Sequence, residues 1–284
     1  MVKSRWMSGR ALAIACAAAT AGIMPRAEAA DYLRGAYSGD TAPRSAGVDW
    51  AGVYGGVHAG ITSGQTDPRP FAQPLTDGAL PQSSVLYGPV SALINLKETN
   101  KAATSYGGFA GINWLWDDVV LGVEMDYTRS SIKANSTFTG GITTRPTGTT
   151  DEYDVSVTAT SRARISDWGT LRGRIGWAAG MFMPYLTAGV AFGNVDGRAT
   201  LNGSWSRYDV SSPPARTFVS SGTFSSVVGR RGITYGAALG AGVDMQLLPG
   251  TFTRLEWQYI QLASGGQRPN ISINSARVAG GIKF

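Results

Sequence analysis

The chain has 284 residues, of which 38 are glycine and 15% are charged, and its mean hydropathy is −0.05. It is too polar for a helical membrane protein and carries too little charge for a typical soluble domain, whereas strands with one lipid-facing and one polar side would average to this value. There are 25 Lys and Arg against 19 Asp and Glu, and this mild excess of positive charge gives no reason to expect a nucleic-acid partner.

The first 30 residues have the pattern of a secretory signal peptide. A basic start precedes an apolar run over 11–24, and the small-x-small motif A-E-A follows at 27–29. We therefore expect export and cleavage after Ala29 or Ala30. The polar residues 31–48 are predicted to form a periplasmic tether that precedes the folded part of the chain.

Eight later segments alternate apolar residues with polar or small ones, which is the period of a β-strand. In chain order they cover about 50–63, 105–116, 119–133, 165–178, 182–197, 231–247, 251–262 and 271–284. The alternation is cleanest after residue 119, where Leu121, Val123 and Met125 fall on one face and Glu124 and Asp126 on the other.

The connections between these segments alternate between long and short. Tight turns are expected at 117–118, 179–180 and 248–250, and a short loop at 263–270. The stretches 64–103, 134–163 and 199–230 are rich in turn-forming and small polar residues and are predicted to be long loops. Short turns at one end and long loops at the other are typical of outer-membrane barrels. The sequence thus predicts an all-β fold, an eight-stranded antiparallel up-and-down transmembrane barrel over 49–284 with three long extracellular loops.

Aromatic residues gather near both ends of the predicted strands. The set at the short-turn ends is Trp50, Trp114, Trp116, Trp177, Phe182, Phe252 and Phe284, and the set toward the long loops is Tyr106, Tyr127, Phe192, Tyr235 and Tyr259. Two aromatic levels separated by one strand length predict girdles at the two interfaces of a membrane.

The last nine residues read A-R-V-A-G-G-I-K-F, and they place Val278, Ile282 and Phe284 on one apolar face. An aromatic C-terminus is hard to bury in a soluble sheet, but a barrel can place it in the aromatic girdle. The ending resembles the C-terminal signal that the outer-membrane assembly machinery reads. We therefore expect this strand to close the barrel, with the lipid bilayer and that machinery as partners.

Seven charged residues fall on the face opposite the apolar one, which in a barrel is the lumen. They are Glu124, Asp126, Arg172, Arg174, Arg254, Glu256 and Arg277. Side chains just fill an eight-stranded barrel, so we interpret this set as a structural ion-pair network that plugs the interior. A catalytic carboxylate pair is less favoured, because the arginines would keep these acids ionised. No catalytic residue is predicted, and the protein is not expected to be an enzyme.

His58 is the only histidine and Cys16 the only cysteine. Cys16 lies in the apolar run of the signal, where we interpret it as a small apolar residue rather than a lipoprotein anchor, so the mature chain would have no thiol. Without a second His or Cys to complete a metal site, we interpret His58 as a polar filler of the lumen rather than a haem or metal ligand. No metal and no cofactor are predicted.

Three stretches and the C-terminal Phe carry a resemblance to a known family. They are W-A-G-V-Y-G-G-V-H-A-G at 50–60, L-R-G-R-I-G-W-A at 171–178 and P-Y-L-T-A-G-V-A-F-G at 184–193. The chain resembles the small outer-membrane β-barrel proteins of alphaproteobacteria, often labelled porin-family or outer-membrane immunogenic proteins. The resemblance covers about 48–284 and does not extend to the long loops.

The resemblance implies a surface protein of the outer membrane with a structural or interaction role, and host or envelope ligands would then bind through the long loops. Some members of the family are reported as porins or haem binders, so a small diffusion porin and a haem-binding surface receptor stay open as alternatives. A secreted soluble β-sandwich is a further alternative, because the mean hydropathy is modest.

Overall fold

The computed structural model describes residues 48–212, 214–262 and 270–284. The predicted signal peptide, its cleavage site and all but the last residue of the predicted tether lie outside these residues. Within them, none of the helices is long and apolar enough to cross a membrane.

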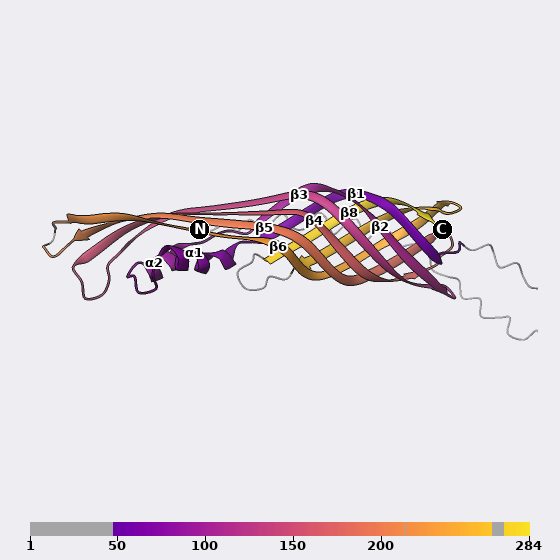
Figure 1. The fold of residues 1–284 in the computed structure, drawn as a ribbon, viewed down its shortest axis with the longest axis horizontal. Coiled ribbons are helices and arrows are strands. Elements are labelled where there is room, and N and C mark those ends of the chain that lie inside the picture. Colours follow the sequence, from indigo (N-terminus) through magenta and orange to yellow (C-terminus); the bar gives the residue numbers. More distant parts are fainter. Residues whose placement is uncertain (1–47, 213, 263–269) are drawn as a thin grey trace, which may run out of the picture. The chain divides into compact units, whose positions relative to one another are not determined.

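Eight antiparallel strands of the described residues pair in chain order and close into a barrel, because β1 pairs with β8 as well as with β2 (Figure 1). The strands are β1 (Gly52–Asp67), β2 (Thr99–Trp116), β3 (Val119–Thr144), β4 (Asp151–Trp177), β5 (Phe182–Asp209), β6 (Thr217–Leu248), β7 (Thr251–Leu262) and β8 (Asn270–Lys283). The predicted eight-stranded antiparallel barrel is confirmed.

Short turns join the strands at one end of the barrel, where the sequence places them. Asp117 between β2 and β3, Gly180 between β4 and β5 and Gly250 between β6 and β7 all have a positive φ, of 53°, 63° and 77°. This left-handed conformation reverses the chain within a few residues, and glycine adopts it without a steric penalty.

The loops predicted over 134–163 and 199–230 are wrong, because most of both stretches is strand. The strands β3 to β6 run on well beyond β1, β2, β7 and β8, and only 145–150 and 210–216 connect them at the far end (Figure 1). The richness in Thr and Ser predicts loops here, but Thr is β-branched and favours strands. The buried residues Val155, Val157 and Leu201 form an apolar face, but the many polar residues around them in the sequence make this face hard to recognise.

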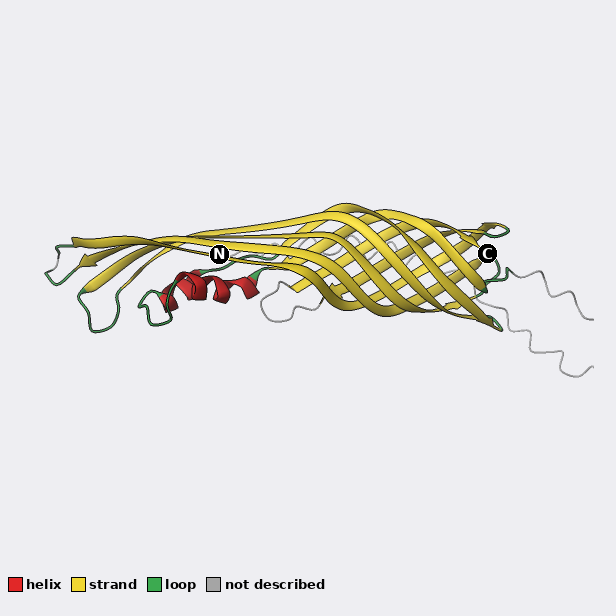
Figure 2. Ribbon diagram, viewed as in Figure 1, coloured by secondary structure: helices red, strands yellow, loops and turns green. Residues whose placement is uncertain are grey.

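The predicted loop over 64–103 is also partly ordered. Here β1 extends to residue 67, β2 begins at 99, and the 3₁₀ helix η1 (Arg69–Phe71), the helix α1 (Ala72–Ala79) and the helix α2 (Tyr87–Leu93) lie between them. The helices lie along the extended strands (Figure 2). Their buried residues include Phe71, Leu75 and Val90, which pack in one cluster with Val155 and Leu201.

These helices and the extended parts of four strands form one folded layer, which we call the platform. It comprises 69–93, 134–161, 199–212 and 214–229, which include the connections at its far end. Its strands stay paired from their far ends down to the barrel, with register shifts between Arg129 and Ile132 in β3, between Ile165 and Asp167 in β4 and between Arg207 and Tyr208 in β5. The platform is therefore an extension of the barrel wall that has its own apolar core.

Apolar side chains on the outside of the barrel form a continuous belt. Exposed members from the middle of the strands include Val57, Ile61, Val123, Met125, Leu171, Leu186, Val190, Leu239, Leu255 and Val278. Exposed Trp114, Trp116, Trp177, Phe182, Ile282 and Phe284 lie toward the turn end, and Tyr106, Tyr127, Phe192 and Tyr235 lie toward the platform. Tyr259 is half-buried. Such a belt between aromatic levels is the lipid-facing surface of a transmembrane barrel.

Trp50 and Phe252 are not part of the girdle, contrary to the prediction, because both are buried. Trp50 precedes β1, and its indole N–H donates to the backbone oxygen of Gly180 at 3.2 Å. Phe252 lies two residues before Arg254 on β7, so it points into the lumen as Arg254 does. The position along a strand sets the depth of a side chain, but the strand period sets which face it takes.

The lipid-facing belt predicts a strong asymmetry between two arginine substitutions on β3. Val123→Arg places a charge in the belt and is expected to lower the free energy of unfolding by about 2–4 kcal/mol if the residue is near the midplane. Ser131→Arg, on the same face but beyond the belt, is the matched control and should have little effect. Urea titration of the folded protein in lipid measures both, and equal losses would contradict the membrane register.

Candidate functional site

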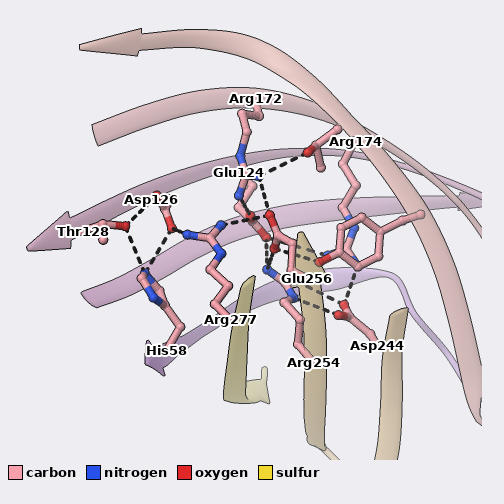
Figure 3. A network of polar contacts seen from close by, with 12 residues as sticks. His58, Glu124, Asp126, Thr128, Arg172, Arg174, Asp244, Arg254, Glu256 and Arg277 are labelled. Atoms are coloured by element: carbon pink, nitrogen blue, oxygen red, sulfur yellow. Dashed lines mark hydrogen bonds and ion pairs between the residues drawn. The ribbon is translucent and has the colours of Figure 1, made fainter. Parts of the chain in front are cut away.

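A group of buried charged side chains lies in the interior of the barrel, to which the strand alternation directs them. The structure brings together all seven predicted residues, Glu124, Asp126, Arg172, Arg174, Arg254, Glu256 and Arg277, and adds Asp244 from β6 (Figure 3). All eight side chains are buried. Among the described residues, the group therefore contains four carboxylates and four guanidinium groups. We call it the lumen network.

Glu124 and Glu256 are the two carboxylates at the middle of the lumen network. Glu124 Oε1 lies 2.6 Å from Arg172 Nη2, and Glu124 Oε2 lies 2.6 Å from Arg254 Nη1. Glu256 Oε1 lies 2.5 Å from Arg172 Nη1 and 2.9 Å from Arg277 Nη2. Each glutamate therefore shares its charge with more than one arginine, which compensates the cost of burying it.

Two tyrosines complete the hydrogen bonds of these glutamates. The hydroxyl of Tyr54 on β1 donates to Glu124 Oε2 at 2.9 Å, and the hydroxyl of Tyr185 on β5 donates to Glu256 Oε2 at 2.8 Å. The guanidinium carbon of Arg174 lies 3.7 Å from the centre of the Tyr185 ring. Through these two residues, strands without a charged member of the network also contact it.

The aspartates lie at the two sides of the lumen network. Asp244 accepts from Arg254 Nε at 2.8 Å and pairs with Arg174. Asp126 Oδ2 lies 2.6 Å from Arg277 Nη1 and 3.2 Å from His58 Nε2. His58 is buried, and its Nε2 is also 3.4 Å from the Thr128 hydroxyl. The histidine is therefore a polar neighbour of the network, as predicted for a lumen filler.

The ion pairs connect opposite walls of the barrel as well as neighbouring strands. Glu124 and Arg172 face each other in the register of β3 and β4, and Glu256 and Arg277 do so in β7 and β8. The pairs Glu124–Arg254, Arg172–Glu256 and Asp126–Arg277 instead join β3 or β4 to β7 or β8. The second kind of pair crosses the interior of the barrel, where side chains from different strands meet (Figure 3).

Inward-facing glycines make room for these long side chains. A Cβ at Gly240 would lie 2.6 Å from Thr187 Oγ1 and 3.1 Å from Arg172 Nη1, and one at Gly242 would lie 2.6 Å from the Tyr185 hydroxyl. The glycines at 240 and 242 of β6 are thus explained by the volume that the network needs inside the barrel.

Apolar clusters lie on both sides of the lumen network. The cluster toward the short turns includes Trp50, Phe109, Met183 and Phe252. The cluster toward the platform consists of Ile132, Ile165, Trp168, Ala191, Val195, Ala238, Ile260, Leu262, Ile271 and Ile273. The charged layer is therefore enclosed between two apolar layers, and each layer takes residues from several strands.

The chemistry of the lumen network is that of charge compensation. Each carboxylate contacts at least one guanidinium group within 3 Å, so its charge is compensated by arginines of the same chain. In the described parts of the chain, no group of three or more His, Cys, Asp or Glu is arranged to hold a metal ion.

Asp244 is the member that sequence reasoning missed, because its strand alternates apolar residues mostly with glycine and alanine. A signal for it exists in the hairpin. Asp244 and Arg254 are equally distant from residue 249 in the turn between β6 and β7, and the register pairs them directly. Charges of opposite sign placed symmetrically about a predicted turn would have indicated the pair.

Breaking the lumen network is expected to be costly. Glu124→Gln leaves Arg172 and Arg254 short of a buried counter-charge, so we expect the free energy of unfolding to fall by about 3–5 kcal/mol. The double variant with Arg254→Gln should lose less than the sum of the two single variants, since the two residues are directly paired. Denaturant titration measures all three.

Asp154→Asn is the control for this experiment. Asp154 is also paired with an arginine, but it lies on the exposed surface of the platform, where an ion pair contributes little. A loss for Glu124→Gln as small as that for Asp154→Asn would contradict the interpretation of the lumen as a compensated buried network.

Several proteins of known structure are similar to the chain. The chain is similar to Ail, the attachment invasion locus protein of Yersinia pestis, with 11% identity over 82% of this chain and 99% of that chain and a TM-score of 0.33. It is similar to Neisserial surface protein A, with 13% identity over 82% and 98% of the two chains and a TM-score of 0.33. For the outer membrane protein OprG from Pseudomonas aeruginosa the identity is 14% over 82% and 96% of the chains, with a TM-score of 0.38. No curated protein matches the chain.

The family comparison covers nearly all of the sequence. The model that describes the outer membrane protein beta-barrel domain matches residues 14–284, which include every strand described above. The chain belongs to this family of outer-membrane β-barrel proteins.

Proposed function

We propose that the protein is a closed anchor in the outer membrane that displays the platform at the cell surface for a structural or interaction role. The observation that carries this proposal is the filled lumen, in which the ionic layer lies between two apolar layers. An interior of this kind supports anchoring rather than the passage of solutes. The grouping with the alphaproteobacterial barrels rests on the sequence motifs and is part of this proposal.

The order of the platform supports an interaction role. Its apolar core is covered by α1 and α2, and its outer surface carries ion pairs such as Arg216 with Glu152 at 2.8 Å and with Asp154 at 2.7 Å. The Thr143 hydroxyl and Arg216 both donate to Asp154 and lower the pKa of its carboxyl below the usual value. A surface that is folded in advance binds a ligand without the entropic cost of ordering a loop.

The geometry of the lumen also bears on the two alternatives, a diffusion porin and a haem-binding receptor. A diffusion porin needs a free axis, which cross-lumen pairs such as Arg172–Glu256 occupy. A haem receptor needs an accessible axial ligand, whereas His58 is buried against Asp126. Neither alternative is favoured by an observation of its own. Val278, Ile282 and Phe284 are exposed on the outside of the barrel, and we retain them as a proposed assembly signal.

The purified wild-type protein is expected to show no steady single-channel conductance in a planar bilayer, because the axis is occupied by paired side chains. The variant Glu124→Ala with Asp126→Ala, which leaves arginines without partners and removes volume, is expected to admit water and ions more readily. A large, reproducible conductance from the wild-type monomer would instead support the porin alternative.

The display of the platform is tested by labelling single cysteines on intact cells. Thr147→Cys lies in the exposed connection between β3 and β4 at the far end of the platform, and Asp118→Cys lies in the exposed turn at the opposite end of the barrel. Because long connections of outer-membrane barrels face outward, a membrane-impermeant maleimide should label only the Thr147 variant. The reverse pattern would place the platform in the periplasm.

A further inference from the structure

The outward face of the barrel changes from apolar to basic directly beyond the aromatic level next to the platform. On β3, Tyr127 is followed at the next outward position by Arg129, about 7 Å further along the strand. The register places Asp167 of β4 opposite Arg129, and further basic residues lie on β3 to β6 just beyond this level. The exposed set consists of Arg129, Lys133, Arg162, Arg164, Arg198 and Arg231, which we call the basic collar.

A polar cavity of about 310 Å³ opens on the basic collar. Its lining residues are Arg129, Arg164, Ser166, Asp167, Asn194, Asp196 and Arg231. The cavity combines guanidinium groups from β3, β4 and β6 with the carboxylates of Asp167 and Asp196. Three arginines that converge from three strands can surround an anionic group with several donors at once.

The register of the collar brings like charges together. Lys133 of β3 is directly opposite Arg164 of β4, and Arg162 of β4 is directly opposite Arg198 of β5. Like charges in directly opposed positions destabilise a sheet. Asp196 is directly opposite Arg164 and Arg231, and Asp167 is directly opposite Arg129, whereas Arg162 and Arg198 have no acidic residue opposite. The six basic residues of the collar thus exceed the two carboxylates beside them, and this excess indicates a counter-charge that comes from another molecule.

The arginines of the collar differ in this respect from the other exposed arginines of the described chain. Arg145, Arg207 and Arg216 on the platform each lie within 3.2 Å of a carboxylate. In the same described residues, no member of the collar forms an ion pair with a carboxylate. Asp167 and Asp196 are directly opposite collar arginines but form no ion pair with them among the described residues, so the guanidinium groups can bind a ligand.

We propose that the basic collar and its cavity bind a phosphate group at the outer surface of the membrane. The location fits the headgroup of a phosphorylated membrane lipid, because the collar directly follows the lipid-facing belt and long Arg side chains can bring their charge to the interface. Free phosphate from solution offers the same chemistry. The site is separate from the lumen network and does not depend on the anchoring function proposed above.

The test is native mass spectrometry of the full-length mature protein in detergent, titrated with phosphatidic acid as a phosphate-monoester lipid and with phosphatidylcholine as the zwitterionic comparison. The wild type is expected to bind phosphatidic acid in preference. The triple variant Arg129→Gln, Arg164→Gln, Arg231→Gln should bind it at least about tenfold more weakly, because each basic residue near a membrane surface contributes to anion binding.

The matched control is the triple variant Arg145→Gln, Arg207→Gln, Arg216→Gln, which removes the same amount of charge from the platform. It should bind phosphatidic acid as the wild type does. Folding of both triple variants is checked by heat-modifiable migration in gels. A collar variant that binds like the wild type, or a control that loses as much affinity as the collar variant, would overturn the proposal.

A gain of binding gives an independent readout. Asp196→Asn removes a negative charge from the lining of the cavity and should tighten the binding of phosphatidic acid by a few fold. A weakened interaction would show that Asp196 takes part in binding something other than an anion, which contradicts the site as proposed.

Inorganic phosphate distinguishes the two sources of the ligand. If inorganic phosphate competes with phosphatidic acid only at much higher concentration, the site recognises the phosphate group and the lipid headgroup is its ligand. If it binds the wild type as tightly as the lipid does and loses binding in the collar variant, the site serves free phosphate. If inorganic phosphate neither binds nor competes, recognition of a phosphate group is refuted.

Discussion

The interior of an eight-stranded barrel is the constraint on which the rest of this structure depends. The cylinder is too narrow to hold bulk water and too wide to be filled by small side chains alone. Here it is filled by long charged residues, which are tolerated only because carboxylates and guanidinium groups are balanced and hydrogen-bonded. Removal of one partner would leave a buried charge uncompensated, so the members of the lumen network constrain one another.

The same network accounts for other features of the wall. Pairs such as Glu124–Arg254 and Asp126–Arg277 connect β3 to β7 and β8, so the two halves of the sheet are joined through the axis as well as along the strands. The volume of Arg172 and Tyr185 requires the glycines that face them on β6. Four strands of this barrel, β3 to β6, extend beyond it into the platform. There α1 and α2 pack against the apolar face of the extended strands, which is no longer part of a closed barrel.

Most of the barrel could be predicted from the sequence, because the lipid belt and the lumen impose a strict period of two. That period identified the strands, their turns and the inward charges other than Asp244. The platform could not be predicted in the same way, since it has solvent on one side and helices on the other. Its outward residues are Thr, Ser and Gly, and its inward apolar residues, such as Val157 and Leu201, are too few to dominate the composition. Trp50 and Phe252 were misplaced because strand ends alone do not determine a face.

Arginine occurs in three environments of this protein, and the pairing differs between them for a physical reason. In the lumen, each arginine is paired within the chain, because no other source of negative charge can reach it. On the platform, pairs such as Arg207–Asp151 form in contact with water and contribute little to stability. At the basic collar the arginines have no carboxylate partner among the described residues, although like charges oppose each other there. The collar is the one of these environments that borders the lipid-facing belt, and a membrane interface can supply anionic groups that neither the lumen nor the aqueous surface provides.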